Sequence, residues 1–360
     1  MEEEHDDMNV LFVFYVPSGG MDTLNRLRCK ALKKYGIHAS CLYYYWGAGV
    51  QNNDEIPMYI TNNDDEIRVI LAAGNYDMIV VTTDHTSFPR FRALGYQGKL
   101  VLEIQGYGSK ENARKQLMDA VPIVNAYADG LLNPCTPHIA AIFQELFPHI
   151  PQFHFPNCFD SESFTYRYGA VPDHPIIAWL GRMEDNKNWR EFLHIGYQLS
   201  YYVPTIELWM FEDPNLADPT ERQQFELMVD NLNLRSRLSL RSNVPNAQMQ
   251  YFYSMIGDSG GFMCSTSKVE GGPLSVLEAM SCLCPVLATH SDGVALCIRH
   301  NETGKNYALG NVAQAVQEGL ELMQNGVLRE SIRLNALRLL QTEFNPHLYC
   351  LSFIGMLNQL

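Results

Sequence analysis

The chain has 360 residues, 46% hydrophobic and 18% charged, so it can bury a sizeable core, and its length suggests two domains. A formal charge of −14 at pH 7 argues against DNA, RNA or anionic lipid as its main partner. The nine cysteines are odd in number and form no pair of CxxC motifs, which argues against a zinc site and favours a reducing compartment. The acidic residues 1–7 are the opposite of a signal peptide. We therefore expect a soluble, cytoplasmic protein.

Strands and helices alternate through the first part of the chain. Strands are predicted at 10–16, 39–45, 78–82, 100–104 and 130–132. Helices are predicted after Gly19-Gly20 up to Gly36, at 67–73, at 111–127, and from Thr136 with Pro137 at the first helical position. The first strand is continuously apolar, which is typical of a parallel sheet covered on both faces.

A proline-rich segment separates this part from a second set of strands and helices. Residues 148–175 contain five prolines and few aliphatic side chains, as expected of a linker. Strands are predicted beyond it at 176–180, 206–211, 237–240, 262–264 and 286–289, with helices at 189–199, 221–232 and through most of 312–360. The pattern predicts an α/β protein with two doubly wound, Rossmann-like domains, at 1–168 and 169–345, and a C-terminal helix, 346–360, that packs back on the first domain.

Two such domains predict a ligand cleft, because ligands of these folds bind beyond the carboxyl ends of the strands. That rule places three segments where they can line one cleft: the Gly19-Gly20 turn, the loop after Leu180 and the loop around Glu270. A Gly-Gly pair is by itself weak evidence, since it is more often a tight turn than a ligand cradle.

The stretch 268–280, Lys-Val-Glu-Gly-Gly-Pro-Leu-Ser-Val-Leu-Glu-Ala-Met, carries the densest group of candidate residues. Pro273 favours a helix that begins directly after it. Ser275 followed by Glu278 matches an N-cap with a capping box, and a free helix N-terminus favours an anion. The alternative is that Ser275 and Glu278 only cap a helix and that Glu270 is a solvated carboxylate.

Two cations follow the first strand of the second domain. Arg182 comes directly after Gly181, and Lys187 lies five residues further on, just before a helix. Near a helix N-terminus such cations suit a diphosphate and can neutralise a leaving phosphate without a metal. The alternative is that both are surface charges beside Glu184 and Asp185.

These phrases together resemble the retaining glycosyltransferases of family 4. The specific one is Glu270-x7-Glu278 continued by Ala279-Met280. The supporting ones are Gly181-Arg182, Lys187-Asn188, Pro285-Val286, the segment 155–160 with Phe164, Gly19-Gly20 and Gly304, which stand in the family's order along nearly the whole chain.

The resemblance implies a GT-B fold, with two domains facing across a cleft and C-terminal helices. It also implies transfer of a sugar from a nucleoside diphosphate sugar, UDP- or GDP-linked, to an acceptor hydroxyl with retention. No metal and no cofactor are expected, and the acceptor, a sugar, glycan or lipid-linked sugar, lies mostly against the first domain.

The resemblance also assigns roles to single residues. Arg182 and Lys187 hold the diphosphate, and backbone amides near Leu274 and Ser275 receive its distal phosphate. Glu270, Gly271 and Gly272 contact the donor sugar, and Glu278 binds the ribose hydroxyls. Gly19 and Gly20 form the glycine loop of the first strand. The predicted catalytic residues are thus Glu270, Arg182 and Lys187, and the predicted donor-binding residues are Gly19, Gly20, Gln105, Gly271, Gly272, Leu274, Ser275 and Glu278.

Gln105 departs from the family, which usually has a histidine there that touches the donor sugar; glutamine can still hydrogen-bond a hydroxyl. Gln105 and several missing glycines motivate a second hypothesis, a catalytically inactive GT-B-like binding or partner subunit. A third is a GT-B nucleotide-sugar epimerase. Donor base and sugar, acceptor, linkage and oligomeric state are left open.

Three further features have two interpretations each. We interpret His85, after a first-domain strand, as a hydrogen-bonded structural histidine rather than a site residue. The aromatic run 43–46 is expected to pack at a strand end rather than to stack on sugars. The helix 22–35 carries five basic residues and could dock at a membrane surface.

Overall fold

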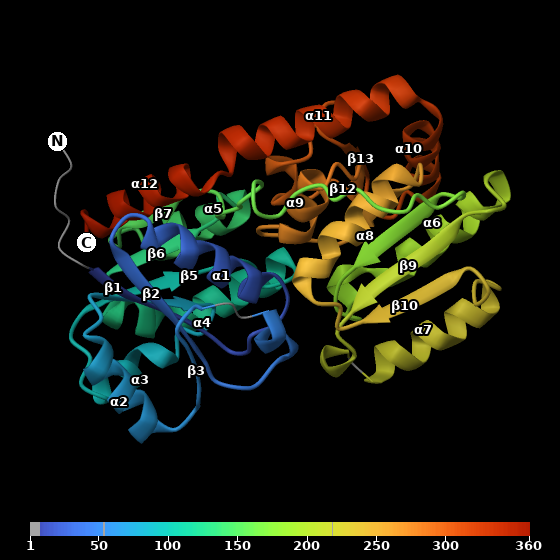
Figure 1. The fold of residues 1–360 in the computed structure, drawn as a ribbon. Helices are drawn as coiled ribbons and strands as arrows, with labels where there is room; N and C mark the ends of the chain where they lie inside the picture. Colours follow the sequence, from blue (N-terminus) through green and yellow to red (C-terminus); the bar gives the residue numbers. More distant parts are fainter. Residues whose placement is uncertain (1–7, 53–54, 218) are drawn as a thin grey trace. The chain divides into compact units, whose positions relative to one another are not determined.

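The chain folds into two compact units, each built around its own sheet (Figure 1). The structure is a computed structural model, and it describes residues 8–52, 55–217 and 219–360. Unit 1 comprises Met1–Phe159 with Phe344–Leu360, and unit 2 comprises Asp160–Glu343. The predicted class, two Rossmann-like α/β domains with C-terminal helices, is confirmed.

The sheet of unit 1 has the strand order β3-β2-β1-β4-β5-β6-β7, and its neighbouring strands are parallel. The strands are β1 (Met8–Phe14), β2 (Ile37–Tyr43), β3 (Met58–Ile60), β4 (Met78–Thr82), β5 (Lys99–Glu103), β6 (Gly130–Asn133) and β7 (Gln152–His154). The helices are α1 (Gly19–Lys33), α2 (Asp64–Gly74), α3 (Ser87–Ala93), α4 (Lys110–Tyr127), α5 (Pro137–Leu146) and α12 (Pro346–Leu357), with a 3-10 turn at Ala48–Asn52. The strand order reverses between β1 and β4.

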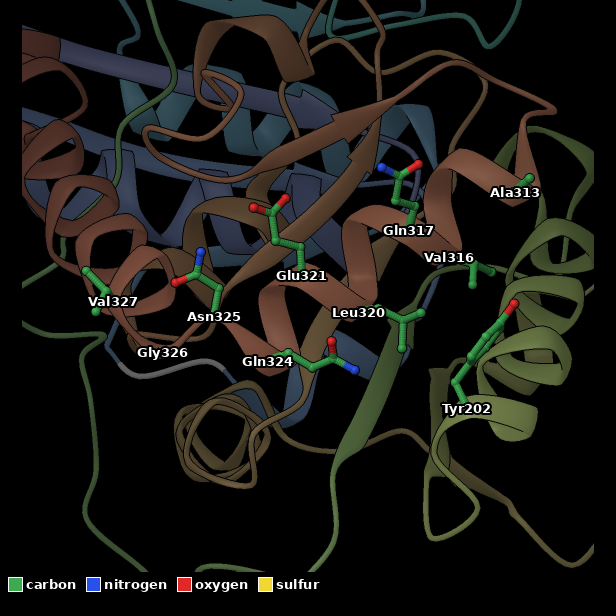
Figure 2. A pocket seen from close by; sticks show the side chains of 10 residues that line it. All are labelled: Tyr202, Ala313, Val316, Gln317, Leu320, Glu321, Gln324, Asn325, Gly326 and Val327. Carbon is green, nitrogen blue, oxygen red and sulfur yellow. The ribbon is translucent and has the colours of Figure 1, made fainter.

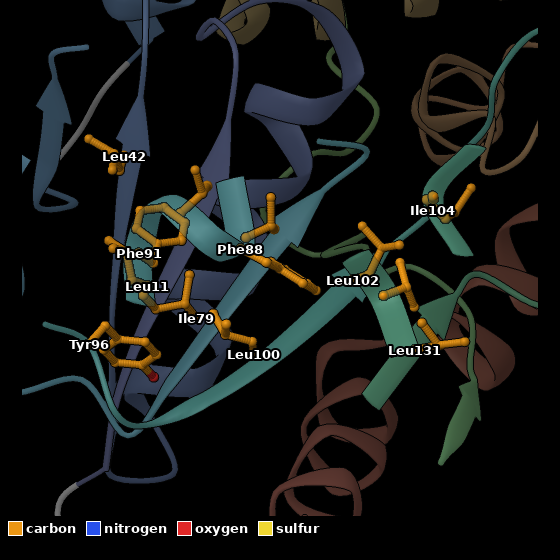
Figure 3. Packing of buried hydrophobic residues seen from close by; sticks show 14 of the residues in the cluster. Leu11, Leu42, Ile79, Phe88, Phe91, Tyr96, Leu100, Leu102, Ile104 and Leu131 are labelled. Carbon is orange, nitrogen blue, oxygen red and sulfur yellow. The ribbon is translucent and has the colours of Figure 1, made fainter. Parts of the chain in front are cut away.

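Both faces of this sheet are buried, which explains why its central strands are continuously apolar. Successive side chains of a strand point to opposite faces. Leu11 and Val13 therefore pack in the cluster that joins the sheet to α2, α3, α4 and α5, whereas Phe12 faces the other side. In the first cluster, Phe88 and Phe91 of α3 lie close to strand side chains such as Ile79 (Figure 3).

The C-terminal helix α12 belongs to the second face of this sheet, together with α1. The fully buried Phe353 lies with its ring centroid 5.9 Å from that of Phe12. Helices α1 and α12 are in contact, and the amide of Phe159 donates to the carbonyl of Phe344 at 2.9 Å. Residues from the two ends of the chain thus build one core.

Helix α1 does not present the basic surface that its sequence suggests. Arg26 and Arg28 are buried and paired, Arg26 with Asp22 at 3.0 Å and Arg28 with Glu103 at 2.8 Å. Of the five basic residues only the three lysines are exposed: Lys30, Lys33 and Lys34. Two of the five charges therefore serve the interior, and three lysines are left for the membrane contact, which stays a prediction. No helix in the described ranges is long and apolar enough to cross a membrane.

The sheet of unit 2 has the strand order β10-β9-β8-β11-β12-β13, again with parallel neighbours. The strands are β8 (Ile176–Leu180), β9 (Glu207–Glu212), β10 (Leu238–Ser242), β11 (Phe262–Ser265), β12 (Val286–Thr289) and β13 (Lys305–Tyr307). The helices are α6 (Trp189–Tyr202), α7 (Pro219–Asn231), α8 (Asn246–Asp258), α9 (Leu274–Ser281), α10 (Val312–Gln324) and α11 (Gly326–Glu343), with 3-10 turns at Asp185–Lys187, Pro214–Leu216 and Val294–Leu296. The order reverses between β8 and β11, so the loops after these two strands meet at a topological switch point.

The division between the units differs from the predicted boundaries because side-chain bonds tie residues 161–168 to unit 2. The amide of Thr165 donates to Gln250 Oε1 at 3.1 Å, and the amide of Arg167 donates to Ser254 Oγ at 2.9 Å. Ser281 Oγ donates to the carbonyl of Phe164 at 2.5 Å. These bonds join residues far apart in the chain, so the local sequence pattern does not predict them.

The sequence prediction missed α3, α8 and three short strands, β3, β7 and β13. Pro89 in the first turn of α3 suggests a break, yet proline is tolerated in a first helical turn. Helix α8 buries Met249, Tyr253 and Ile256 rather than a stripe of aliphatic residues. Each missed strand has three residues, too few to show an alternating pattern.

Truncation of Phe353 tests whether α12 is an integral part of the core of unit 1. We expect Phe353→Ala to lower the free energy of unfolding by about 3–5 kcal/mol, because a buried ring against Phe12 is lost. Leu351→Ala, on the half-exposed side of the same helix, should change it by less than about 0.5 kcal/mol. Urea denaturation of both variants measures the difference, and equal effects would contradict the packing of α12.

Candidate functional site

Two loops of unit 2 meet at its switch point and bring the predicted site residues together. They follow β8 (residues 181–188) and β11 (residues 266–273), and we call them the loop pair. Asn186 joins them: its carbonyl accepts from the amide of Lys268 at 2.8 Å, and its side-chain Nδ2 donates to the carbonyl of Val269 at 3.0 Å. Lys268 Nζ also lies 2.7 Å from Asp185 Oδ1. The two loops are thus held in a fixed register.

Lys187 and Glu270 form the central contact of the loop pair. Lys187 Nζ lies 2.5 Å from Glu270 Oε1, and the two side chains are 22% and 13% exposed. Beneath them, the buried Thr266 Oγ1 lies 2.9 Å from the carbonyl of Lys187 and accepts from Trp179 Nε1 at 3.1 Å. The main chain of Lys187 is therefore anchored, and its ammonium group is held beside a carboxylate at the edge of the sheet.

Arg182 is placed differently from Lys187. Its side chain is 55% exposed and its Nη2 lies 3.2 Å from Glu184 Oε1. This geometry matches the alternative of a surface charge beside Glu184 for Arg182. For Lys187 the surface-charge alternative does not hold, because Lys187 pairs with Glu270 rather than with Asp185. Asp185 pairs with Lys268 instead.

Helix α9 begins as predicted after Pro273, but the predicted capping box is wrong. Its N-cap is Pro273 without a side-chain cap bond, and Ser275 is already the second helical residue. Glu278 does not turn back to the N-terminus because α8 holds it: Asn246 Nδ2 donates to Oε1 at 2.8 Å and the Tyr253 hydroxyl donates to Oε2 at 3.3 Å. Burial and the Glu278 carboxylate raise the pKa of Tyr253 well above its ordinary value, which keeps the hydroxyl a donor.

The N-terminus of α9 lies next to the loop pair and keeps one backbone amide, that of Ser275, unpaired within the described residues. Within the described residues, the N–H of Ser275 has no hydrogen-bond partner, and that of Leu274 bonds only locally, to the carbonyl of Gly272 at 2.9 Å. The carbonyl of Glu270 accepts from the amide of Gly293 at 3.0 Å, which fixes the glycine turn. A free helix N-terminus with Lys187 nearby is an arrangement that suits phosphate oxygens.

In unit 1, Gly19 and Gly20 are the first two residues of α1 rather than a loop before it. Gly19 has φ +61°, a left-handed conformation that glycine adopts without strain, and an added Cβ would meet nothing within 4 Å. Glycine is required here by the backbone and not by crowding. Whether a ligand approaches Gly19 and Gly20 remains a prediction.

Gln105 follows β5 in unit 1 and is hydrogen-bonded on both ends of its carboxamide. Its Nε2 donates to Glu103 Oε1 and to Asn157 Oδ1, both at 2.9 Å, and its Oε1 accepts from Asn157 Nδ2 at 2.8 Å. Sequence reasoning identified Gln105 but missed these partners. Asn157 lies in the segment 155–160 that supports the family resemblance, so a signal for it existed.

Other residues of the loop pair and its support were also missed. Asn186 stands between two charged candidates and carries no motif of its own, and Thr266 follows a strand without any polar pattern. Asn246 begins the missed helix α8. Only the register of parallel strands brings these side chains to Lys187 and Glu278.

Two interpretations of unit 1 are wrong or only half right. In the described part of the chain the imidazole of His85 makes no hydrogen bond, so it is not a satisfied structural histidine, and burial lowers its pKa. In the aromatic run, Tyr43 and Tyr44 are buried as predicted, whereas Tyr45 is 58% and Trp46 75% exposed. The run packs only in its first half.

A surface hollow of unit 2 has none of the predicted site residues in its lining. It is lined by residues of α6, α10 and the turn into α11, among them Tyr202, Leu320 and Glu321 (Figure 2). Glu321 is already engaged, because its Oε2 accepts from Lys305 Nζ at 2.7 Å. Its lining residues include the acidic Glu321 and no lysine or arginine, so this hollow is unsuited to a diphosphate.

A double-mutant cycle tests the coupling between Lys187 and Glu270. We expect Lys187→Met and Glu270→Gln each to lower the free energy of unfolding by about 1–3 kcal/mol, since each leaves a half-buried charge without its partner. The double variant should lose less than the sum, with a coupling energy of about 1 kcal/mol. Thermal and urea unfolding measure all four proteins, and strictly additive losses would show that the contact is not energetically real.

Residues 161–338 match the family model described as glycosyl transferases group 1, a range inside unit 2 that contains Arg182, Lys187, Glu270 and Glu278. The 2-deoxystreptamine N-acetyl-D-glucosaminyltransferase of Niallia circulans is 20% identical over 180 residues, 50% of this chain and 44% of that protein. The chain therefore spans less than half the length of this curated relative.

In the described ranges no group of three or more His, Cys, Asp or Glu side chains is placed to hold a metal ion.

Two solved structures share the fold over nearly the whole chain. Anabaena HepE in complex with UDP-glucose has a TM-score of 0.81 at 16% identity and covers 98% of this chain and 100% of its own. Sucrose-phosphate synthase of Thermosynechococcus elongatus has a TM-score of 0.78 at 16% identity, with 98% of each chain covered. The chain thus has the GT-B fold, and unit 2 matches the glycosyl transferases group 1 model over residues 161–338, which supports a GT-B glycosyltransferase.

Proposed function

We propose that this protein is a metal-independent, retaining glycosyltransferase of family 4 that moves a sugar from a nucleoside diphosphate sugar to an acceptor hydroxyl. The observation that carries the proposal is the Lys187–Glu270 contact beside the N-terminus of α9, whose Ser275 amide is unpaired within the described residues, at the switch point of a parallel sheet. The group 1 domain match over residues 161–338 supports the same reaction class.

The diphosphate of the donor is proposed to bind at Lys187 and at the N–H groups of Leu274 and Ser275. A cation and a helix N-terminus stabilise the negative charge that grows on the leaving diphosphate as the glycosidic bond breaks. Arg182, whose exposed side chain is paired with Glu184, can turn towards the phosphate oxygens. A charge-stabilising site of this kind needs no metal ion.

The rest of the donor is proposed to contact the two carboxylates and the glycine turn. Glu270, Gly271 and Gly272 contact the sugar, and Glu278 accepts hydrogen bonds from the ribose hydroxyls. Asn246 Nδ2 and the Tyr253 hydroxyl hold one oxygen each of the Glu278 carboxylate, which fixes its position in α9. In unit 1, Gly19, Gly20 and Gln105 remain predicted donor contacts.

The proposed step is a single displacement on one face of the sugar. The bond between the anomeric carbon and the diphosphate oxygen breaks, and the acceptor oxygen forms a new bond to the same carbon from the same side. The acceptor proton passes to the departing phosphate oxygen, so the products are a glycoside and a nucleoside diphosphate. No protein base is required, and the chain supplies charge stabilisation and positioning.

A UDP-hexose is the donor that we propose. HepE binds UDP-glucose and UDP, and the Niallia circulans relative is named as an N-acetyl-D-glucosaminyltransferase. For the acceptor we propose a sugar or glycan, because unit 1 exposes Tyr45 and Trp46, whose rings can stack on sugar faces. A cytoplasmic location fits nine free cysteines, eight of them buried, and stays a prediction.

Nucleotide release from a panel of UDP-, GDP- and ADP-sugars tests the reaction class. We expect release with one donor, and a loss of about 10²- to 10³-fold in Lys187→Ala, which removes stabilisation of the leaving group, and in Glu270→Ala, which removes a contact to the donor sugar. Arg235→Ala and Glu226→Ala are the matched controls, since they break an exposed ion pair of the same unit far from the loop pair in sequence. Wild-type turnover in both site variants would refute the assignment.

The same panel separates the alternatives. An inactive partner subunit releases no nucleotide from any donor, and an epimerase yields an isomerised sugar without an acceptor. With an acceptor present, NMR of the product should show the anomeric configuration of the donor. An inverted product would refute retention while leaving the transferase.

Removal of divalent metals tests the proposed independence from metal ions. We expect turnover in excess EDTA to stay within about twofold of that with added Mg²⁺ or Mn²⁺, because Lys187 and helix N–H groups already neutralise the leaving group. The measurement is the rate of nucleotide release after dialysis against chelator. A loss that added metal restores would overturn metal independence.

A further inference from the structure

A buried ion pair lies beneath the carboxyl end of β5, outside the proposed chemistry of unit 2. Arg28 of α1 is fully buried, and its Nη1 donates to both oxygens of Glu103, at 2.8 and 3.0 Å. Glu103 is 2% exposed. Nε and Nη2 of Arg28 find no hydrogen-bond partner in the described residues. The Glu103 carboxylate is therefore the group that neutralises the buried guanidinium charge. Removing one partner alone would leave an unpaired charge in the interior.

Glu103 in turn determines which end of the Gln105 carboxamide faces it. It also accepts from Thr82 Oγ1 at 2.7 Å and from Gln105 Nε2 at 2.9 Å. A carboxylate paired with a guanidinium only accepts hydrogen bonds, so the neighbouring atom of Gln105 has to be nitrogen. The charge of Glu103 therefore decides an orientation that the shape of a carboxamide leaves open.

Asn157 completes the arrangement by pairing with Gln105 in both directions. Gln105 Nε2 donates to Asn157 Oδ1 at 2.9 Å, and Asn157 Nδ2 donates to Gln105 Oε1 at 2.8 Å, with Asn157 only 5% exposed. An amide nitrogen has two hydrogens, and Glu103 and Asn157 use both. The oxygen accepts two bonds and has used one. The half-buried Gln105 thus keeps one acceptor position and no donor.

We propose that the Arg28–Glu103 ion pair and Asn157 hold Gln105 in a single orientation in which it offers a ligand only a hydrogen-bond acceptor, and so selects a sugar hydroxyl. The identity of the ligand as a sugar rests on the proposed function, whereas the orientation does not. Arg28, Glu103 and Asn157 act through Gln105 and are positioning residues. A deoxy, fluoro or carbonyl group in place of that hydroxyl lacks the hydrogen that Gln105 needs.

Exchange of the side-chain amide hydrogens tests the orientation without any ligand. Gln105 Nε2 signals in ¹⁵N-labelled protein are assigned by their loss in Gln105→Ala, and Gln97→Ala identifies the signals of an exposed glutamine of the same unit. We expect both Gln105 hydrogens to exchange at least about tenfold more slowly than those of Gln97, since both are bonded. Exchange as fast as that of Gln97 would overturn the fixed orientation.

Two variants release the carboxamide in different ways. Arg28→Met combined with Glu103→Gln removes both charges together and replaces the acceptor-only group by one that accepts either orientation. Asn157→Ala leaves the ion pair intact and frees one Nε2 hydrogen, so it serves if the double variant does not fold. In either variant, exchange at Gln105 should accelerate about tenfold or more. Unchanged protection in both would overturn the role of the positioning residues.

Binding of UDP-glucose and its deoxy and deoxyfluoro analogues tests the selection of a hydroxyl. Calorimetry should show one ring position where both analogues bind about threefold to tenfold more weakly than the parent, because fluorine cannot donate. In Gln105→Ala that loss should vanish. Parent-like binding of the fluoro analogue beside a weakened deoxy analogue, or the same losses in Gln105→Ala, would overturn the selection. If neither UDP-glucose nor UDP binds the wild type, the proposed donor and the hydroxyl selection both fail, and the exchange experiment still decides the orientation.

Discussion

The register of the parallel strands in unit 2 is the constraint on which the candidate site depends. Because β8 and β11 are neighbours and point the same way, the loops that follow them leave the sheet side by side. Asn186 and Thr266 then fix these loops to one another through backbone carbonyls and amides. Lys187 and Glu270, 83 residues apart in sequence, meet at 2.5 Å only because of this register.

Basic side chains of this acidic chain occur both in the interior and at the surface, and their pairing has different consequences in the two places. Arg28 and Lys305 are fully buried, and each is matched by carboxylates, Lys305 by Glu318 at 2.5 Å and Glu321 at 2.7 Å. Such pairs fix local geometry, since the loss of one partner is costly. Lys187 is instead partly exposed beside a carboxylate, so an incoming diphosphate can compete for it. The same residue types thus serve structure in the interior and, in the proposed function, bind the donor at the edge of the sheet.

The two units divide the chemistry according to which side chains they leave open. Unit 2 offers a cation and a helix N-terminus, groups that suit a diphosphate. Unit 1 offers exposed aromatic rings at Tyr45 and Trp46 and a constrained carboxamide at Gln105, groups suited to hydroxyls and sugar faces. The two units thus expose different kinds of side chain, which is consistent with the proposal that unit 2 binds the donor diphosphate and unit 1 the acceptor.

The sequence alone determined the class of fold and the residues of the loop pair. Continuous apolar strands alternating with helices specify parallel sheets covered on both faces, and strands 78–82, 176–180 and 286–289 were placed to the residue. Arg182 and Glu270 stood out as charged residues next to glycine after predicted strands. Lys187 was identified because it lies just before a predicted helix, and Glu278 because it follows Ser275 by three residues. Helix α9 was also placed after Pro273, because proline fixes a helix start locally.

Only the tertiary structure decided the partners of these residues. Glu278 matched a capping box in sequence, yet α8 draws it away through Asn246 and Tyr253, which local pattern cannot foresee. The sequence suggested that Arg28 is a surface charge of an amphipathic helix, whereas in the structure it is buried and paired with Glu103. Composition and periodicity report which face of an element is apolar, whereas the pairing of polar groups depends on contacts between residues far apart in the chain. The orientation of Gln105 is for that reason a property of the fold and not of its sequence neighbours.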